Sequence, residues 1–184
     1  MKSIPYGRQN ISQEDKLSVC KFLEQDFITS GKNVALFEKK IKKILSCKYS
    51  VSCNSGTSAI HLALISIGLK KNDIVVMPAV NFIAAFNVCN LIGAKVYLSD
   101  VDSFTGQMTP KNLLDCIKIN KLKYIKVVIT SQLGGHALNV PEFYNIKIKY
   151  NFFLIEDVCH SFGAKYFFKK KLFSISSDFS KSSL

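Results

Sequence analysis

The sequence predicts an α/β fold built around a mostly parallel β-sheet, and three observations lead to that prediction. Short apolar runs recur along the chain, as is typical of buried parallel strands. Stretches with apolar residues at helical spacing separate these runs. Several of these stretches are followed by a glycine or carry a proline in their first turn, which are signals of helix ends. A length of 184 residues fits one domain.

Two helices are expected before the first strand. Ser12, followed by Asp15, predicts a helix N-terminus, and the helix extends to about Gln25. The pair Ser30 and Gly31 then breaks the chain. A second helix is predicted from apolar residues that share one helical face, namely Val34, Phe37, Ile41, Ile44 and Leu45.

Strands and helices then alternate. Strands are predicted at 49–53, 74–77, 95–99, 124–130 and 152–156. Helices are predicted between them at 57–67, 82–92, 109–119 and 140–150. The pattern from residue 165 onward is less regular. Because each strand is followed by a helix, the strands are expected to run parallel in one sheet.

Charge and cysteine usage exclude several classes of partner. The net charge of +12 comes almost entirely from lysine, since Arg8 is the only arginine. Nucleic-acid surfaces rely on the planar arginine side chain, so we expect no nucleic-acid partner. The six cysteines form no CxxC pair and show no His/Cys spacing typical of zinc, and the pair Asp100 and Asp102 alone is a weak signal, so no metal site is expected. No apolar run approaches a membrane span and the first ten residues lack a signal-peptide core, so a cytoplasmic protein is expected.

A hydroxyl-rich turn, 54–58, follows the first predicted strand and opens a helix. Ligands of open parallel sheets bind beyond the carboxyl ends of the strands, so this turn is a candidate site. Free N–H groups and the positive end of the helix dipole would suit a phosphate there. The turn lacks the Walker and GxGxxG patterns, and simple N-capping by Ser or Thr is the alternative interpretation.

Three further side chains follow predicted strands. Asp157 closes an apolar run and needs a partner, which could be a pyridinium nitrogen or the N–H groups of the next turn. Phe82 could stack on a flat cofactor or belong to the core, and His160 could bond a ring oxygen or fill a polar niche. Together with the phosphate turn, the aromatic residue and the acid favour a flat, phosphorylated cofactor.

The order of these motifs resembles one protein family. Matching segments lie at 4–6, 27–31, 54–59, 78–82, 93–94, 100–102, 134–135 and 156–164. With these segments the chain resembles the DegT/DnrJ/EryC1/StrS family of pyridoxal-phosphate (PLP) sugar aminotransferases. Within the family it is most similar to enzymes that make UDP-4-amino-4,6-dideoxy sugars on the pseudaminic acid route.

The resemblance implies a fold and a division of the chain. The fold would be the three-layer, mostly parallel α/β large domain of fold-type I PLP aminotransferases, without the small C-terminal domain. Residues 1–31 would form a helical arm with a substrate-side loop, and 32–184 an incomplete PLP-binding domain. The implied cofactor-binding residues are Ser55, Gly56, Thr57, Phe82, Asp157 and His160, and the implied substrate-binding residues are Tyr6, Asp26, Phe27, Ile28 and Thr29.

The resemblance also implies an activity. Members move an amino group, usually from glutamate, to a nucleotide-linked 4-keto-6-deoxy sugar, and work as homodimers with active sites at the subunit interface. In the family a hairpin, here 165–168 and 171–175, precedes an Asp, here Asp178, a Ser-Phe-rich strand and then the Schiff-base lysine. That lysine is expected just past Leu184, since Lys181 comes too early. No catalytic residue is therefore expected within the chain, which alone should be inactive.

Two alternatives stay open at this point. A PLP-dependent keto-sugar dehydratase has the same fold and a histidine in place of the lysine. A non-catalytic remnant of an aminotransferase is the other possibility, and it could use its basic surface for binding.

Overall fold

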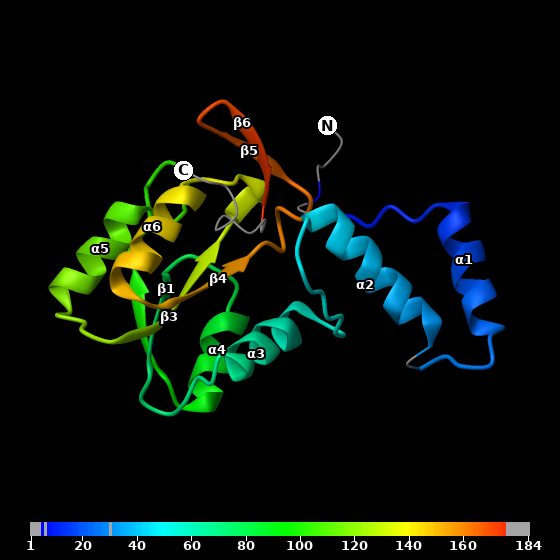
Figure 1. Cartoon of the computed structure of the whole chain (residues 1–184), viewed down its shortest axis with the longest axis horizontal. Coiled ribbons are helices and arrows are strands. Elements are labelled where there is room, and N and C mark those ends of the chain that lie inside the picture. The colour runs from blue at the N-terminus through cyan, green and yellow to red at the C-terminus, as the bar shows by residue number, and fades with distance from the viewer. Residues whose placement is uncertain (1–4, 6, 30, 176–184) are drawn as a thin grey trace.

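The computed structural model describes residues 5, 7–29 and 31–175, and its centre is a four-stranded parallel sheet (Figure 1). The strands lie in the order β2-β1-β3-β4 and all pair in parallel. Their bounds are β1 Ile74–Pro78, β2 Lys95–Ser99, β3 Ile125–Ser131 and β4 Phe153–Asp157. The predicted α/β fold with a mostly parallel sheet is confirmed.

Helices cover both faces of the sheet. The helices α3 (Gly56–Ser66) and α4 (Ala84–Ile92) pack on one face, and α5 (Pro110–Ile119) and α6 (Val140–Tyr150) pack on the other. Neighbouring strand residues enter opposite cores: Val127 and Ile129 face α3 and α4, whereas Val128 faces α5 and α6. Because both faces are buried, the strands have continuous apolar runs instead of alternating ones.

The connections place a crevice at one edge of the sheet. The helix α4 joins β1 to its neighbour β2, and α5 then carries the chain back past β1 to β3. The helix α6 continues from β3 to β4. The strand order therefore reverses between β1 and β3, and a ligand crevice is expected beyond the carboxyl ends of these two strands.

Capping residues set the helix ends close to where the sequence predicted them. The Thr109 side chain accepts from the backbone N–H of Asn112 at 3.2 Å and begins α5. Gly93 ends α4 with φ of +83°, a conformation that favours glycine.

The predicted strand at 49–53 is wrong. In the part of the chain that the structure describes, this segment pairs with no strand. Tyr49 and Val51 expose 74% and 79% of their surface, so the apolar residues that suggested a buried strand face solvent. The Ser52 N–H donates to Glu38 Oε1 at 2.8 Å, which ties the segment to a helix instead of the sheet.

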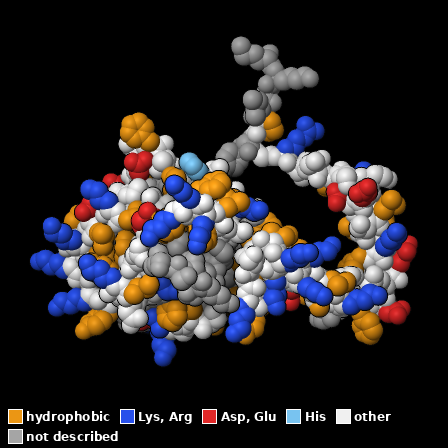
Figure 2. Space-filling view, turned by 45° about the horizontal axis from the view of Figure 1, so that its top comes forward, with side chains coloured by type: hydrophobic (Ala, Val, Ile, Leu, Met, Phe, Trp, Pro, Cys, Tyr) orange, Lys and Arg blue, Asp and Glu red, His pale blue; other side chains and the backbone are white. Residues whose placement is uncertain are grey.

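The first two helices lie to one side of the three layers (Figure 1). They are α1 (Gln13–Leu23) and α2 (Lys32–Leu45), and α1 begins with the predicted capping box of Ser12 and Asp15. Neither helix contains a buried residue. Figure 2 shows hydrophobic side chains on the surface of α1 and α2, and the exposed ones include Leu17, Val19, Leu23, Val34, Leu36, Phe37 and Ile44.

A hairpin follows β4, as the sequence suggested. Its strands β5 (Lys165–Phe168) and β6 (Lys171–Ser174) pair antiparallel. The two residues of its turn, Lys169 and Lys170, both have positive φ, which suits the twist of a tight hairpin. Asp178 and Lys181 lie outside the described residues.

Candidate active site

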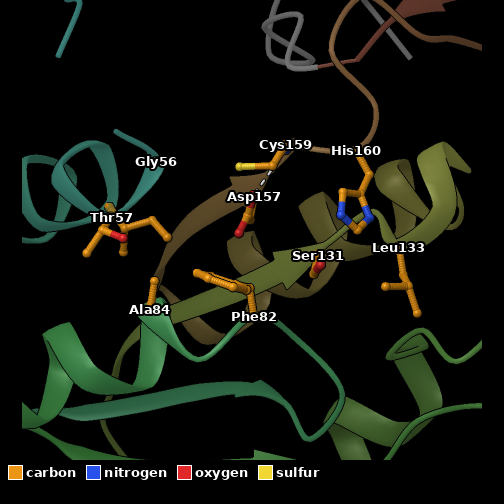
Figure 3. Close-up of a pocket in the computed structure, with 10 residues that line it drawn as sticks. Gly56, Thr57, Phe82, Ala84, Ser131, Leu133, Asp157, Cys159 and His160 are labelled. Carbon is orange, nitrogen blue, oxygen red and sulfur yellow. Dashed lines mark hydrogen bonds between the residues drawn. The ribbon is translucent and has the colours of Figure 1, made fainter. Parts of the chain in front are cut away.

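A cavity of about 300 Å³ lies beyond the carboxyl ends of β1, β3 and β4 (Figure 3). This is the edge at which the strand order reverses. Four separate segments line the cavity: Gly56, Thr57 and Ile60 from α3, Phe82 and Ala84 after β1, Ser131 and Leu133 at the end of β3, and Asp157, Cys159 and His160 at the end of β4. The structure thus brings together five of the six residues that the sequence suggested for a cofactor.

The first turn of α3 presents backbone N–H groups to the cavity. Ser55 is the N-cap, and its Oγ accepts from the Ser58 N–H at 3.1 Å. The N–H groups of Gly56 and Thr57 have no acceptor among the described residues, as is usual in a first helical turn. Two free donors at the positive end of a helix dipole make this wall suitable for an anion.

Ser55 itself does not line the cavity. Its hydroxyl accepts from Ser58 and also donates to Ser58 Oγ at 3.0 Å, so it serves as the cap of α3. The N-cap interpretation therefore describes Ser55, while a direct contact of Ser55 with a ligand stays a prediction.

Asp157 forms the opposite wall. Its side chain is half-buried, and Oδ1 accepts from the Cys159 N–H at 3.1 Å. No lysine, arginine or histidine in the described part of the chain forms an ion pair with it, since the salt bridge found there joins Lys111 and Asp115. A half-buried carboxylate without a cation is favourable only when another partner compensates its lost hydration. A cationic N–H group in the cavity would be such a partner.

Cys159 lies between these two walls and was missed by the sequence analysis. The hydrogen bond from its thiol to Asp157, together with burial and the charge of Asp157, raises the pKa of the thiol to about 11. The thiol is therefore protonated at neutral pH and acts as a donor to Asp157. A Cβ placed on Gly56 would lie 3.4 Å from the Cys159 sulfur, which shows how closely α3 approaches this loop.

Phe82 is an exposed residue of the cavity wall and does not belong to the core. It exposes 73% of its surface and follows β1 in a turn that the Asn81 side chain holds by donating to the Pro78 oxygen at 2.9 Å. Figure 3 shows its ring directed into the space between Thr57 and Asp157. A flat ligand could stack on this ring.

The imidazole of His160 is held by the turn that follows β3. The Gly134 N–H donates to His160 Nδ1 at 3.3 Å. Because Nδ1 accepts, the proton of the neutral ring lies on Nε2. No described residue accepts from Nε2, so this group can donate to a ligand. Gly135 has φ of +81°, and a Cβ there would lie 2.8 Å from the His160 oxygen. Glycine is therefore required at this position.

Those residues suggested for substrate binding that the structure describes do not line this cavity. Asp26 and Phe27 line a different hollow between α1 and α2, and Ile28 and Thr29 are exposed in the same connection. Tyr6 lies outside the described residues. In a single copy of the chain, the arm and the cavity are therefore separate.

The described residues contain neither a metal-binding cluster nor a membrane-spanning helix. No group of three or more His, Cys, Asp or Glu side chains there could hold a metal ion. None of the helices in that part of the chain has the length and hydropathy needed to cross a bilayer.

The chain has clear relatives among proteins of known sequence. The DegT/DnrJ/EryC1/StrS aminotransferase family matches the chain over residues 9–172. A UDP-4-amino-4,6-dideoxy-N-acetyl-β-L-altrosamine transaminase of Campylobacter jejuni is 32% identical over 167 residues, which cover 91% of this chain and 44% of that protein. A GDP-perosamine synthase of Escherichia coli O157:H7 is also 32% identical, over 90% of this chain and 45% of that protein. The chain thus spans less than half the length of these curated relatives.

Solved structures share the fold. A Helicobacter pylori aminotransferase involved in pseudoaminic acid biosynthesis matches with a TM-score of 0.81 and 21% identity, over 92% of this chain and 45% of that one. A sugar aminotransferase of Streptococcus pneumoniae, solved in its PMP form, matches with a TM-score of 0.80 and 22% identity, over 89% and 44%. At these identities the likeness establishes the fold alone.

Proposed function

The chain belongs to the DegT/DnrJ/EryC1/StrS aminotransferase family, as its motifs predicted, and we propose that its cavity binds PLP. We propose further that the whole protein transfers an amino group from glutamate to a nucleotide-linked 4-keto-6-deoxy sugar. The observation that carries the proposal is the cavity itself, in which an anion-binding helix start, an exposed aromatic ring and a half-buried carboxylate surround one space (Figure 3).

The residues present fit this cofactor. The free N–H groups of Gly56 and Thr57 would bind its phosphate at the start of α3. Phe82 would lie against the flat ring, and His160 Nε2–H would donate to a ring oxygen. A cavity of about 300 Å³ is at the lower end of the usual range for small-molecule sites.

Asp157 would have the main electronic role. Its carboxylate would accept the ring N–H and keep that nitrogen protonated, because a charge-assisted hydrogen bond favours the charged form of both partners. When bound, PLP supplies an electron sink for the bonds to the amino-bearing carbon. The Cys159 N–H, which donates to Asp157 Oδ1, would keep the carboxylate in place.

The separate arm supports a homodimer. Asp26 and Phe27 cannot serve the cavity of their own chain as it stands, and the arm exposes many apolar side chains that a partner would cover. We propose that a second copy packs against the arm, so that Tyr6 and the segment from Asp26 to Thr29 line the substrate side of the partner cavity. A cytoplasmic location belongs to the same proposal, in keeping with six free cysteines.

Amino transfer is preferred over the dehydratase alternative because the matched family is one of aminotransferases and a matched relative is a sugar-nucleotide transaminase. None of the described residues that line the cavity is a lysine, so they would hold PLP by non-covalent contacts alone. No separate observation in the structure favours a non-catalytic binding role.

Titration of the purified chain with PLP and with pyridoxal, followed by cofactor absorbance and fluorescence, tests the proposal. PLP should bind, and pyridoxal should bind at least tenfold more weakly because it lacks the phosphate that Gly56 and Thr57 would hold. Equal affinity for both ligands would refute the phosphate site.

A further inference from the structure

A side chain that does not line the cavity holds one of its walls. Gln107 lies in the loop between β2 and α5 and exposes only 5% of its surface. Its Nε2 donates to the backbone oxygens of Leu133 and His136, each at 3.0 Å. These oxygens stand at the two ends of the turn 133–136, so one amide group ties both ends together.

The loop that carries Gln107 is itself closely held. Asp102 Oδ1 accepts from the Thr105 N–H and the Thr105 hydroxyl, both at 2.9 Å. The backbone oxygen of Gln107 accepts from the Asp102 N–H at 2.9 Å. Gly106 approaches the turn so closely that a Cβ there would lie 3.1 Å from Leu133 Cδ2. The loop therefore offers a fixed support for the amide of Gln107.

On its other side, the same turn holds His160. The Gly134 N–H donates to His160 Nδ1 at 3.3 Å, and Gly135 lies directly against the His160 oxygen. Any shift of the turn would therefore move the donor that fixes the imidazole. It would also move Leu133, which lines the cavity.

We propose that Gln107 is a positioning residue of the cavity, which acts through the turn 133–136 to keep the His160 imidazole in one orientation with Nε2–H free for a ligand. The link between Gln107 and His160 is a property of the chain alone. Its effect on PLP affinity rests on the proposed function. If Gln107 only satisfied the two backbone oxygens, its replacement would leave the orientation of the His160 imidazole unchanged.

Amide hydrogen exchange tests the link without any cofactor. The substitution Q107M keeps the length of the side chain and removes both donors. We expect the Gly134 N–H to exchange about tenfold faster in this variant, because two hydrogen bonds that hold the turn are lost. Exchange at Val127 and Val128 in β3 should stay unchanged. The control Q13M alters an exposed glutamine of α1 and should leave Gly134 unaffected.

A double-mutant cycle then tests the effect on PLP affinity. Q107M should weaken binding about three- to tenfold in the wild-type background and less than twofold in the H160A background, because coupled residues are not additive. Equal weakening in both backgrounds would show that Gln107 acts by another route and would overturn the proposal. If the wild-type chain binds no PLP, the proposed function fails, while the exchange result still decides the role of Gln107.

Unchanged Gly134 exchange in a folded Q107M variant would also overturn the proposal. Should Q107M not fold, H160A tests the link from its other end. In H160A the Gly134 N–H should exchange faster, while the side-chain amide protons of Gln107 stay protected. An unchanged Gly134 rate in H160A would show that His160 is not held by the turn.

Discussion

Replacing Asp157 by Asn removes one charge from the cavity wall and changes little else. The Asn side-chain oxygen can still accept from the Cys159 N–H, which now bonds Asp157 Oδ1 at 3.1 Å. What is lost is the carboxylate that would face the ring nitrogen of PLP. The α3 side of the cavity, with Gly56 and Thr57, is not touched by the change.

The size of the effect follows from the kind of bond that is lost. A hydrogen bond to a charged partner contributes about 1.5–3 kcal/mol, against about 0.5–1.5 kcal/mol for a neutral one. The difference of about 1–2 kcal/mol predicts PLP affinity about five- to thirtyfold weaker in D157N. Asp157 is half-buried, so solvent screening reduces the effect only in part.

Titration of cofactor absorbance at several pH values is the assay. D157N should bind more weakly, and the bound ring nitrogen should lose its proton at lower pH than in the wild type. The matched control D100N changes an acid that follows the edge strand β2 and does not line the cavity. Equal PLP affinity in D157N and the wild type would refute the assignment of Asp157 as the partner of the ring nitrogen.

Three further predictions concern single groups. In the wild type, Asp157 raises the pKa of the Cys159 thiol to about 11. Alkylation of Cys159 near pH 8.5 should therefore be slower in the wild type than in D157N, and bound PLP should protect the thiol from alkylation. Burial raises the pKa of the Glu156 carboxyl to about 7, above its ordinary value of 4.5. The buried acid is therefore neutral at low pH, and the free energy of unfolding falls as the pH rises from about 4.5 to 7. E156Q should therefore show no such fall in urea unfolding and should be about 1–3 kcal/mol more stable than the wild type at pH 8; equal stability there would contradict the buried acid. Gly135→Ala should destabilise the fold more than Gly68→Ala and should weaken PLP binding, because both have positive φ but only Gly135 meets a backbone oxygen at 2.8 Å. Equal unfolding free energies for the two variants would contradict the close approach.

The spacing of apolar residues and the residues typical of helix ends were sufficient to predict most helices and strands. The predicted helix at 140–150 and strand at 95–99 match α6 and β2. The run at 49–53 was misassigned because apolar content does not reveal whether a neighbouring strand is available, and none of the described strands pairs with it. Strand pairing is a tertiary property that a local pattern cannot establish.

The candidate site was predictable where topology alone brings residues together. Gly56, Phe82 and Asp157 could be named because each follows a predicted run or opens a helix, and parallel strands end at one edge. The role of Gln107 could not be predicted in this way. Its hydrogen bonds reach 26 and 29 residues along the chain, and no motif marks such a contact.

A crystal structure of the chain grown with PLP is the most direct test of the account. The phosphate should lie within hydrogen-bond distance of the Gly56 and Thr57 N–H groups, with the ring nitrogen at the Asp157 carboxylate and the ring against Phe82. PLP bound elsewhere, or in this cavity with its phosphate directed away from the start of α3, would contradict the account.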